Sequence, residues 1–99
     1  MISKTSPFPV INNVNHQRFE AEVDGQLAFA SYIRESDRVI FDHTFVPDLL
    51  CGKGVAATLV RAALDEARQQ RWRIVPRCSF VAGFIERNPE FSDLVDQRR

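Results

Sequence analysis

One stretch decides the fold of this chain: it runs from Phe45 to Gln70 and reads FVPDLLCGKGVAATLVRAALDEARQQ. Six of its apolar residues recur at spacings of three and four, which predicts a helix with one buried face: Ala56, Leu59, Val60, Ala63, Leu64 and Ala67. On the opposite side, Arg61 and Asp65 are spaced to pair across one turn. We therefore expect the end of a strand, a short glycine loop and then a long helix.

Two glycines, Gly52 and Gly54, flank Lys53 just before this helix. Glycine lets the backbone take positive φ or approach a ligand closely. The first turn of a helix has unpaired N–H groups with partial positive charge, so a glycine loop leading into it suits a phosphate or pyrophosphate. Lys53 would add a point charge. A tight turn into the helix is the alternative interpretation.

Two common phosphate motifs do not fit this loop. The Walker A loop requires Ser or Thr where this chain has Val55, and it also requires an earlier glycine. The letters from Gly52 to Ala57 satisfy the dinucleotide pattern G-x-G-x-x-G/A, but Pro47 to Leu50 separate them from the strand. That motif also expects an acidic residue about 20 positions later, and residues 71–77 contain none.

The rest of the chain predicts a sheet around this helix. Arg18 to Val23 alternates in polarity, Asp24-Gly25 is a two-residue hairpin signal, and further strands are expected at residues 26–33 and 39–46. After the helix, residues 71–77 form a short strand that should lie parallel to 39–46. Ser79 is the expected N-cap of a second helix. Residues 1–15 form an arm or one edge strand, and residues 16–99 form a single domain.

The loop and its surroundings resemble motif A of the GNAT superfamily, the acyl-CoA N-acyltransferases. That motif has Arg or Gln, two residues, Gly, one residue, then Gly or Ala, and Gly54 and Ala56 match the last two positions. Cys51 departs from it, because it stands where Arg or Gln is usual.

Three further motifs are similar to those of a small, single-domain GNAT-like branch. They are His43-Thr44 on a strand, the run Val75-Pro76-Arg77-Cys78-Ser79-Phe80, and Pro89-Glu90-Phe91. The resemblance covers roughly Val39 to Val95. It implies a truncated GNAT-like α/β (α+β) fold, with an antiparallel meander of about three strands, then a helix, a parallel strand and a helix.

The resemblance also implies where acetyl-CoA or coenzyme A would bind. The amides around the glycine loop would hold its pyrophosphate: Cys51, Gly52, Lys53, Gly54, Val55 and Ala56. The backbone of Thr44, Phe45 and Val46 would pair with the amide groups of the pantetheine arm. From the topology alone, ligands in such sheets bind beyond the carboxyl ends of the strands, where Val46 and Cys78 lie.

Cys78 and His43 are the candidate catalytic residues. Cys78 follows a strand and precedes a helix, so the helix dipole would favour its thiolate, the form that attacks a thioester. The alternative is a small buried residue filling the junction. His43 has the intrinsic pKa of a general base, or it packs in the sheet and hydrogen-bonds a neighbour. Asp42 projects to the opposite face of the strand, so it cannot form a dyad with His43.

Two positions depart from the branch in the second helix. Phe84 stands where a tyrosine able to protonate the leaving thiolate is common, and Asn88 stands where histidine is common. A zinc site could draw on Cys51, Cys78, His16 and His43, but these residues lack the paired spacing of metal ligands, so we expect no metal.

The composition of the chain excludes some classes of binding partner. Thirteen basic and thirteen acidic residues cancel, whereas nucleic-acid binders carry a basic excess, so we expect no nucleic-acid partner. Two cysteines without a C-x-x-C pair indicate a reducing compartment. No apolar run of about 18 residues occurs and Met1 leads into no apolar signal segment, so we expect a cytoplasmic protein with no membrane partner.

These observations favour an acetyl-CoA-dependent N-acetyltransferase that acetylates an amine, directly or through Cys78. The acceptor would be a small-molecule amine or a protein lysine, and the protein a monomer or weak homodimer. The alternative is a non-catalytic coenzyme A-binding or interaction module. A structural domain without a ligand is a third possibility.

Overall fold

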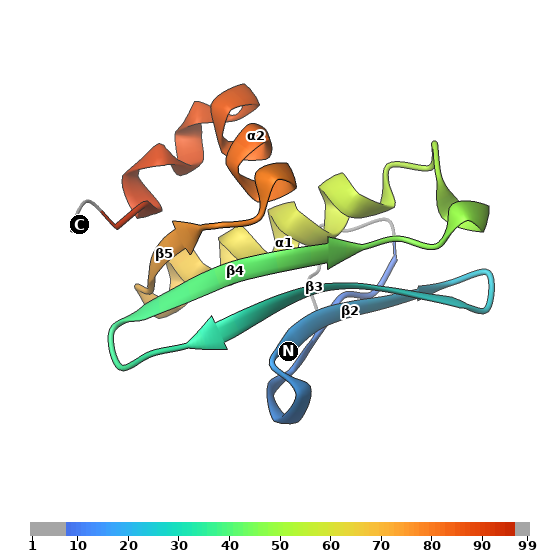
Figure 1. Ribbon diagram of the computed structural model, residues 1–99, viewed down its shortest axis with the longest axis horizontal. Coiled ribbons are helices and arrows are strands. Elements are labelled where there is room, and N and C mark those ends of the chain that lie inside the picture. Colours follow the sequence, from blue (N-terminus) through green and yellow to red (C-terminus); the bar gives the residue numbers. More distant parts are fainter. Residues whose placement is uncertain (1–7, 97–99) are drawn as a thin grey trace.

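The computed structural model describes residues 8–96 and contains one five-stranded sheet (Figure 1). In sequence and in space the strands follow the same order: β1 (Ile11–Asn13), β2 (Arg18–Val23), β3 (Gln26–Arg34), β4 (Arg38–Phe45) and β5 (Arg73–Pro76). β1 to β4 are antiparallel neighbours, and β5 pairs with β4 in parallel. The expected mixed α/β fold, a meander followed by a helix and a parallel strand, is confirmed.

The hairpin between β2 and β3 has the two-residue turn that the sequence predicts. Val23 pairs with Gln26, and Asp24 and Gly25 between them have φ angles of 52° and 76°. Positive φ at both turn residues is typical of the tight turns whose twist matches that of antiparallel strands. This turn fixes the register, which places Phe19 and Ala21 in the buried core.

The long helix α1 (Val55–Gln70) connects β4 to β5 and lies across one face of the sheet (Figure 1). Seven of its residues are buried: Val55, Leu59, Val60, Ala62, Ala63, Leu64 and Ala67. They pack into one hydrophobic core with β2, β3 and β4. Ala56, expected on the buried face, is half-buried. Because β4 and β5 are parallel, the start of α1 and the end of β5 both lie toward the carboxyl end of β4.

The second helix, α2 (Ser79–Arg87), packs against α1, β4 and β5. Ser79 is its first residue, and the N-cap is Cys78, so the prediction that Ser79 caps the helix was wrong by one residue. The strand β5 ends at Pro76, which leaves room for only Arg77 and Cys78 before the helix. Arg61 lies against Asn88 and Glu90 rather than forming the expected pair with Asp65.

Three short 3₁₀ helices complete the fold: η1 (Val14–His16), η2 (Asp48–Leu50) and η3 (Pro89–Leu94). β1 is an edge strand of the sheet, and η1 spans the expected boundary between residues 15 and 16. Residues 1–7 of the expected arm and 97–99 of the expected domain lie outside the described residues. The division into arm and domain therefore stays a prediction.

One face of the sheet remains open to solvent in the described part of the chain. Leu27, Ile33 and Phe45 are exposed large apolar residues on β3 and β4. Ala28 and Tyr32, the strand neighbours of Leu27 and Ile33, are buried, as alternation along a strand requires. Of the helices in residues 8–96, none has the length and apolar character needed to cross a membrane.

Candidate functional site

Within residues 8–96, no strand pairs with the carboxyl end of β4 on its β5 side. Pairing between the two strands stops at Phe41 and Pro76, and the N–H of Cys78 then donates to the carbonyl of Phe41 over 2.8 Å. β4 itself continues to Phe45 (Figure 1). Its register with β3 shifts by one residue at Asp42, between the pairs Tyr32–Phe41 and Ser31–His43. Such a bulge bends a strand and interrupts its pairing.

The glycine loop follows this strand end through Pro47 and η2 (Figure 1). Gly52 and Gly54 have φ angles of 82° and 71°, and Gly54 is the N-cap residue of α1. Both positions therefore favour glycine for backbone reasons. A Cβ added at either one would meet no atom within 4 Å, so the space beside them is open.

In the described part of the chain, several amides of the loop have no hydrogen-bond partner. The N–H groups of Cys51 and Lys53 donate to Asp48 and Leu50 within the turn. Within residues 8–96, no hydrogen bond uses the N–H groups of Gly52, Gly54, Val55 or Ala56. Free N–H groups at the start of a 16-residue helix, with its positive dipole end behind them, have the chemistry of an anion site.

Lys53 has a partner that the sequence analysis missed. Its Nζ lies 2.8 Å from Oδ2 of Asp24, at the tip of the β2–β3 hairpin. Both side chains are exposed, so this ion pair contributes little to stability and can open. The exposed thiol of Cys51 lies 4.0 Å from the carbonyl oxygen of Pro47.

Cys78 lies beside Thr44, which brings the end of β4 and the start of α2 together. The Sγ of Cys78 is 3.5 Å from Oγ1 of Thr44. Burial raises the pKa of this thiol. The Thr44 hydroxyl and the backbone N–H groups of Val81, Phe80 and Thr44 together lower the pKa by more than burial raises it. The net pKa is below the ordinary value for cysteine, because these donors stabilise the thiolate.

His43 projects from the opposite face of β4. Adjacent strand residues point to opposite faces, so the side that turns Thr44 toward Cys78 turns His43 away from it. The His43 ring is exposed and lies with its centroid 6.3 Å from that of Phe29. The structure therefore brings Thr44, Cys78 and the loop to one end of β4, and it separates the two candidate catalytic residues.

Comparison with known proteins adds to this geometry. The family profile described as GCN5-related N-acetyl-transferase matches residues 18–94, which is most of the chain. The chain belongs to this family. The resemblance seen in its motifs is thereby confirmed.

Individual curated relatives share less than a third of the aligned residues with this chain. The Bos taurus protein NATD1 is 29% identical over 86 residues, covering 84% of this chain and 76% of its own length. Its Gallus gallus counterpart is 25% identical over 92 residues, covering 90% and 84%. The solution structure of a GCN5-like protein from Staphylococcus aureus has a TM-score of 0.67 and 28% identity, and the match covers 91% of this chain and 89% of that one.

The structure explains the two departures in α2 as packing. Phe84 is buried, with its ring centroid 6.0 Å from that of Phe91 and 5.3 Å from the guanidinium carbon of Arg61. Asn88 is the C-cap residue of α2 and donates to the carbonyl of Phe84 over 2.9 Å. Both side chains therefore hold the helices together.

Metal ligands do not cluster in the described part of the chain. Across residues 8–96, no group of three or more His, Cys, Asp or Glu residues could hold a metal ion. What sequence reasoning missed is the Thr44 side chain, which was expected to contribute only its backbone. Its proximity to Cys78 depends on the β4–β5 register, for which the sequence offered no local signal.

Proposed function

We propose that this chain is an acetyl-CoA-dependent N-acetyltransferase that moves an acetyl group to an amine. One observation carries the proposal: within residues 8–96, the amides of Gly52, Gly54, Val55 and Ala56 have no hydrogen-bond partner and lie just beyond a strand end that no strand pairs with on its β5 side. Diphosphate and pantetheine need these two kinds of backbone donor, and membership of the family supports the assignment.

The residues present fit acetyl-CoA. The amides from Cys51 to Ala56 would hold the diphosphate, with those of Cys51 and Lys53 first giving up their turn hydrogen bonds. Lys53 would have to leave Asp24 to add its charge. The backbone groups of Thr44, Phe45 and Val46 on the side of β4 away from β3 would pair with the pantetheine amides. Acetyl-CoA supplies an acetyl thioester, and this placement would leave that group near Cys78.

Cys78 is the proposed nucleophile of a two-step route. Its thiolate Sγ attacks the thioester carbonyl, the bond to the coenzyme sulfur breaks, and the acetyl group is left on Cys78. An amine nitrogen then attacks this second thioester and regenerates the thiolate, while the nitrogen loses a proton to base. Backbone N–H groups near Phe45 and Val46 would stabilise the oxyanion in both steps.

Direct attack by the amine on acetyl-CoA is the other route, with His43 as the proposed base. Because His43 lies on the open face of β4, it can serve only an amine that approaches from that face. That face is exposed in the described residues, which suits a protein lysine as well as a small amine.

A coenzyme A-binding module without turnover is the second candidate. Two observations favour it: His43 and Cys78 are on opposite sides of β4, and Phe84, at the usual tyrosine position, is a buried phenyl ring. Such a site would bind the coenzyme without a complete set of proton-transfer groups.

Labelled acetyl-CoA distinguishes the candidates. The protein is incubated with it, with and without a polyamine or a lysine peptide, and mass spectrometry locates the label on Cys78 and on the amine. Cys51→Ala is the matched control for Cys78→Ala, because it removes the other thiol of the chain.

Label on Cys78 that passes to the amine supports the two-step route. Label on the amine that survives Cys78→Ala but falls with His43→Gln supports direct attack. Acetyl-CoA binding without label on any amine above a no-enzyme control would contradict the transferase and leave the binding module.

A further inference from the structure

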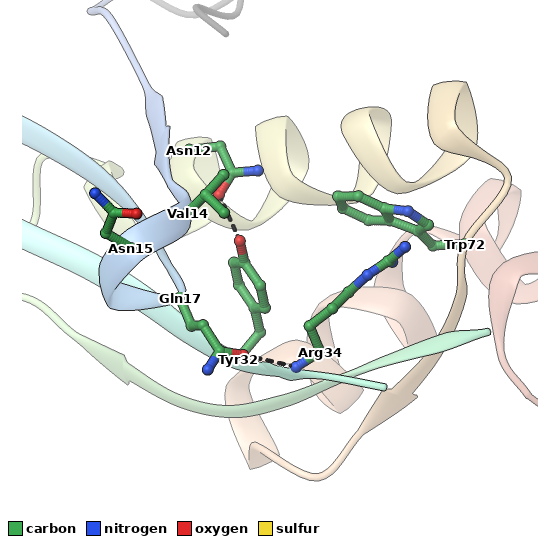
Figure 2. Close-up of a pocket in the computed structure, with 7 residues that line it drawn as sticks. All are labelled: Asn12, Val14, Asn15, Gln17, Tyr32, Arg34 and Trp72. Atoms are coloured by element: carbon green, nitrogen blue, oxygen red, sulfur yellow. Dashed lines mark hydrogen bonds between the residues drawn. The ribbon is translucent and has the colours of Figure 1, made fainter. Parts of the chain in front are cut away.

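A cavity lies away from the glycine loop, toward the other end of β4. It has a volume of about 380 Å³, within the usual range for small-molecule sites. Tyr32 and Arg34, which line it, pair with Phe41 and Val39, whereas the loop follows the opposite strand end at Phe45. Trp72, at the start of β5, forms another wall (Figure 2). The cavity is therefore separate from the candidate acyl-transfer site.

Arg34 gives the cavity one cation with no internal partner. Its guanidinium carbon lies 4.5 Å from the centroid of the Trp72 ring, which holds the planar group in place. Among residues 8–96, no carboxylate forms an ion pair with it, and no acidic residue lines the cavity. Arg34 is thus the one charged side chain among the described residues that line the cavity. Burial raises the pKa of Tyr32 in the cavity wall, and the negative charge of the Glu66 carboxylate, which acts on this lining, raises it as well.

The neighbouring amides are turned so that their donors are free. Oδ1 of Asn12 accepts from the Tyr32 hydroxyl over 2.6 Å, and Oε1 of Gln17 accepts from the Arg34 backbone N–H over 2.8 Å. Figure 2 shows both amide nitrogens turned away from these bonds. Within residues 8–96, no hydrogen bond uses the side-chain nitrogen of Asn12 or of Gln17. These amide nitrogens are therefore available to donate to a ligand with acceptor atoms.

We propose that this cavity binds a small planar organic acid, with its carboxylate on the Arg34 guanidinium and the Asn12 amide. Its ring would contact the apolar wall formed by Tyr32, Trp72 and Val14. A guanidinium binds a carboxylate in a bidentate, charge-assisted manner. One cation beside neutral amides matches a monoanion better than a dianionic phosphate. The ligand is not the acetyl acceptor, because the cavity lies toward the amino end of β4 and the candidate acyl-transfer site lies at its carboxyl end.

Trp72 makes the proposal directly measurable, since it is the single tryptophan of the chain. Phenylacetate, benzoate and nicotinate are titrated against the full chain while Trp72 emission is followed. Phenylacetamide and nicotinamide are the matched neutral probes. We expect a saturable change with an acid and about tenfold weaker binding of its amide, since a hydrogen bond to a charged group contributes about 1.5–3 kcal/mol.

Arg34→Gln is the test variant and Arg87→Gln the control, because Arg87 is an exposed arginine on α2 that does not line the cavity. Arg34→Gln should weaken acid binding about tenfold while Arg87→Gln leaves it unchanged. Backbone amide NMR should place the shifts at residues 12–17, 32–34 and 72, with folded spectra for both variants.

The proposal is overturned if no acid gives saturation below about 10 mM, the weak end of specific binding. Equal binding of acid and amide, equal loss in both variants, or shifts confined to the glycine loop would also overturn it. Coenzyme A plays no part in these measurements, so their outcome is independent of the proposed transferase activity.

Discussion

Cys78 and Thr44 form the contact on which the proposed chemistry depends at the scale of single residues. The Thr44 hydroxyl stabilises the Cys78 thiolate, so replacing it with the methyl group of valine should raise the pKa of the thiol. Because only the thiolate is alkylated, the pH midpoint of Cys78 alkylation by iodoacetamide should lie below that of ordinary cysteine. Thr44→Val should move it to higher pH.

The measurement uses a Cys51→Ser background, which leaves Cys78 as the only thiol. Ser31→Ala is the control, since this hydroxyl bonds Asp42 on the same pair of strands without touching Cys78. An unchanged midpoint in Thr44→Val, or an equal change in Ser31→Ala, would mean that Thr44 does not tune the thiol.

Arg71 has a backbone conformation that suits glycine. It caps the C-terminus of α1 with φ at 60°, and its N–H donates to Arg68 over 3.2 Å. Left-handed conformations cost a residue with a Cβ about 1–2 kcal/mol, partly offset by the entropy that glycine loses on folding. Arg71→Gly should therefore stabilise the protein by about 0.5–1 kcal/mol.

Urea unfolding measures this change, and Gln69→Gly is its matched control. Gln69 is exposed inside the last turn of the same helix, where glycine should destabilise by up to about 1 kcal/mol. A destabilised Arg71→Gly protein would show that the side chain contributes more than its backbone strain costs.

At the scale of elements, the parts with a local pattern were predictable. Alternation and Asp24-Gly25 indicated the hairpin, and the spacing of Leu59, Val60 and Ala63 indicated α1, because burial of one face leaves its period in the sequence. The 3₁₀ helix η3 and the cap at Cys78 were missed. They depend on tertiary contacts, such as the hydrogen bond from Cys78 to Phe41, which no local pattern records.

The same distinction applies to the candidate site. The glycine loop could be placed, since Gly52 and Gly54 mark backbone positions that need positive φ. The Lys53–Asp24 pair and the separation of His43 from Cys78 could not. Both follow from the sheet register and the bulge at Asp42, which set which distant residues meet.

Arg61 joins three elements. Its guanidinium carbon lies 5.3 Å and 5.4 Å from the ring centroids of Phe84 and Phe91, and it donates to Oδ1 of Asn88 over 2.9 Å. Arg61→Ala should destabilise the fold by about 1–2 kcal/mol, because it removes both cation–π contacts and the packing of the aliphatic stem. Urea unfolding measures the loss, and Arg87→Ala, an exposed arginine on α2, should change it little. Equal effects would contradict the assigned role.

At the scale of the whole molecule, the two ends of the sheet are chemically different. One end has free backbone amides and Cys78, whereas the other has the cavity around Arg34 and Trp72. The central strands between them are buried against α1, so each end can be altered without exposing the core. Binding at the loop should consequently act on global stability only through mass action.

Coenzyme A should raise the unfolding temperature of the whole chain. A ligand at 100 times its Kd adds about 2.7 kcal/mol, which for a domain of this size is roughly 10–20 °C. Gly54→Ala should remove most of this shift, because a Cβ meets nothing in the free protein and would crowd only a bound diphosphate. Gly25→Ala is the matched control, because Gly25 also has positive φ, at 76°, and an added Cβ there meets no atom, but it lies outside the glycine loop.

Both variants should therefore lose similar stability without ligand, and only Gly25→Ala should keep the coenzyme A shift. If coenzyme A stabilises both variants alike, the diphosphate does not lie on the glycine loop. If coenzyme A stabilises neither variant and does not stabilise the wild type, this chain does not bind coenzyme A. Pantetheine completes the series: it lacks the diphosphate, so its smaller shift should be insensitive to Gly54→Ala.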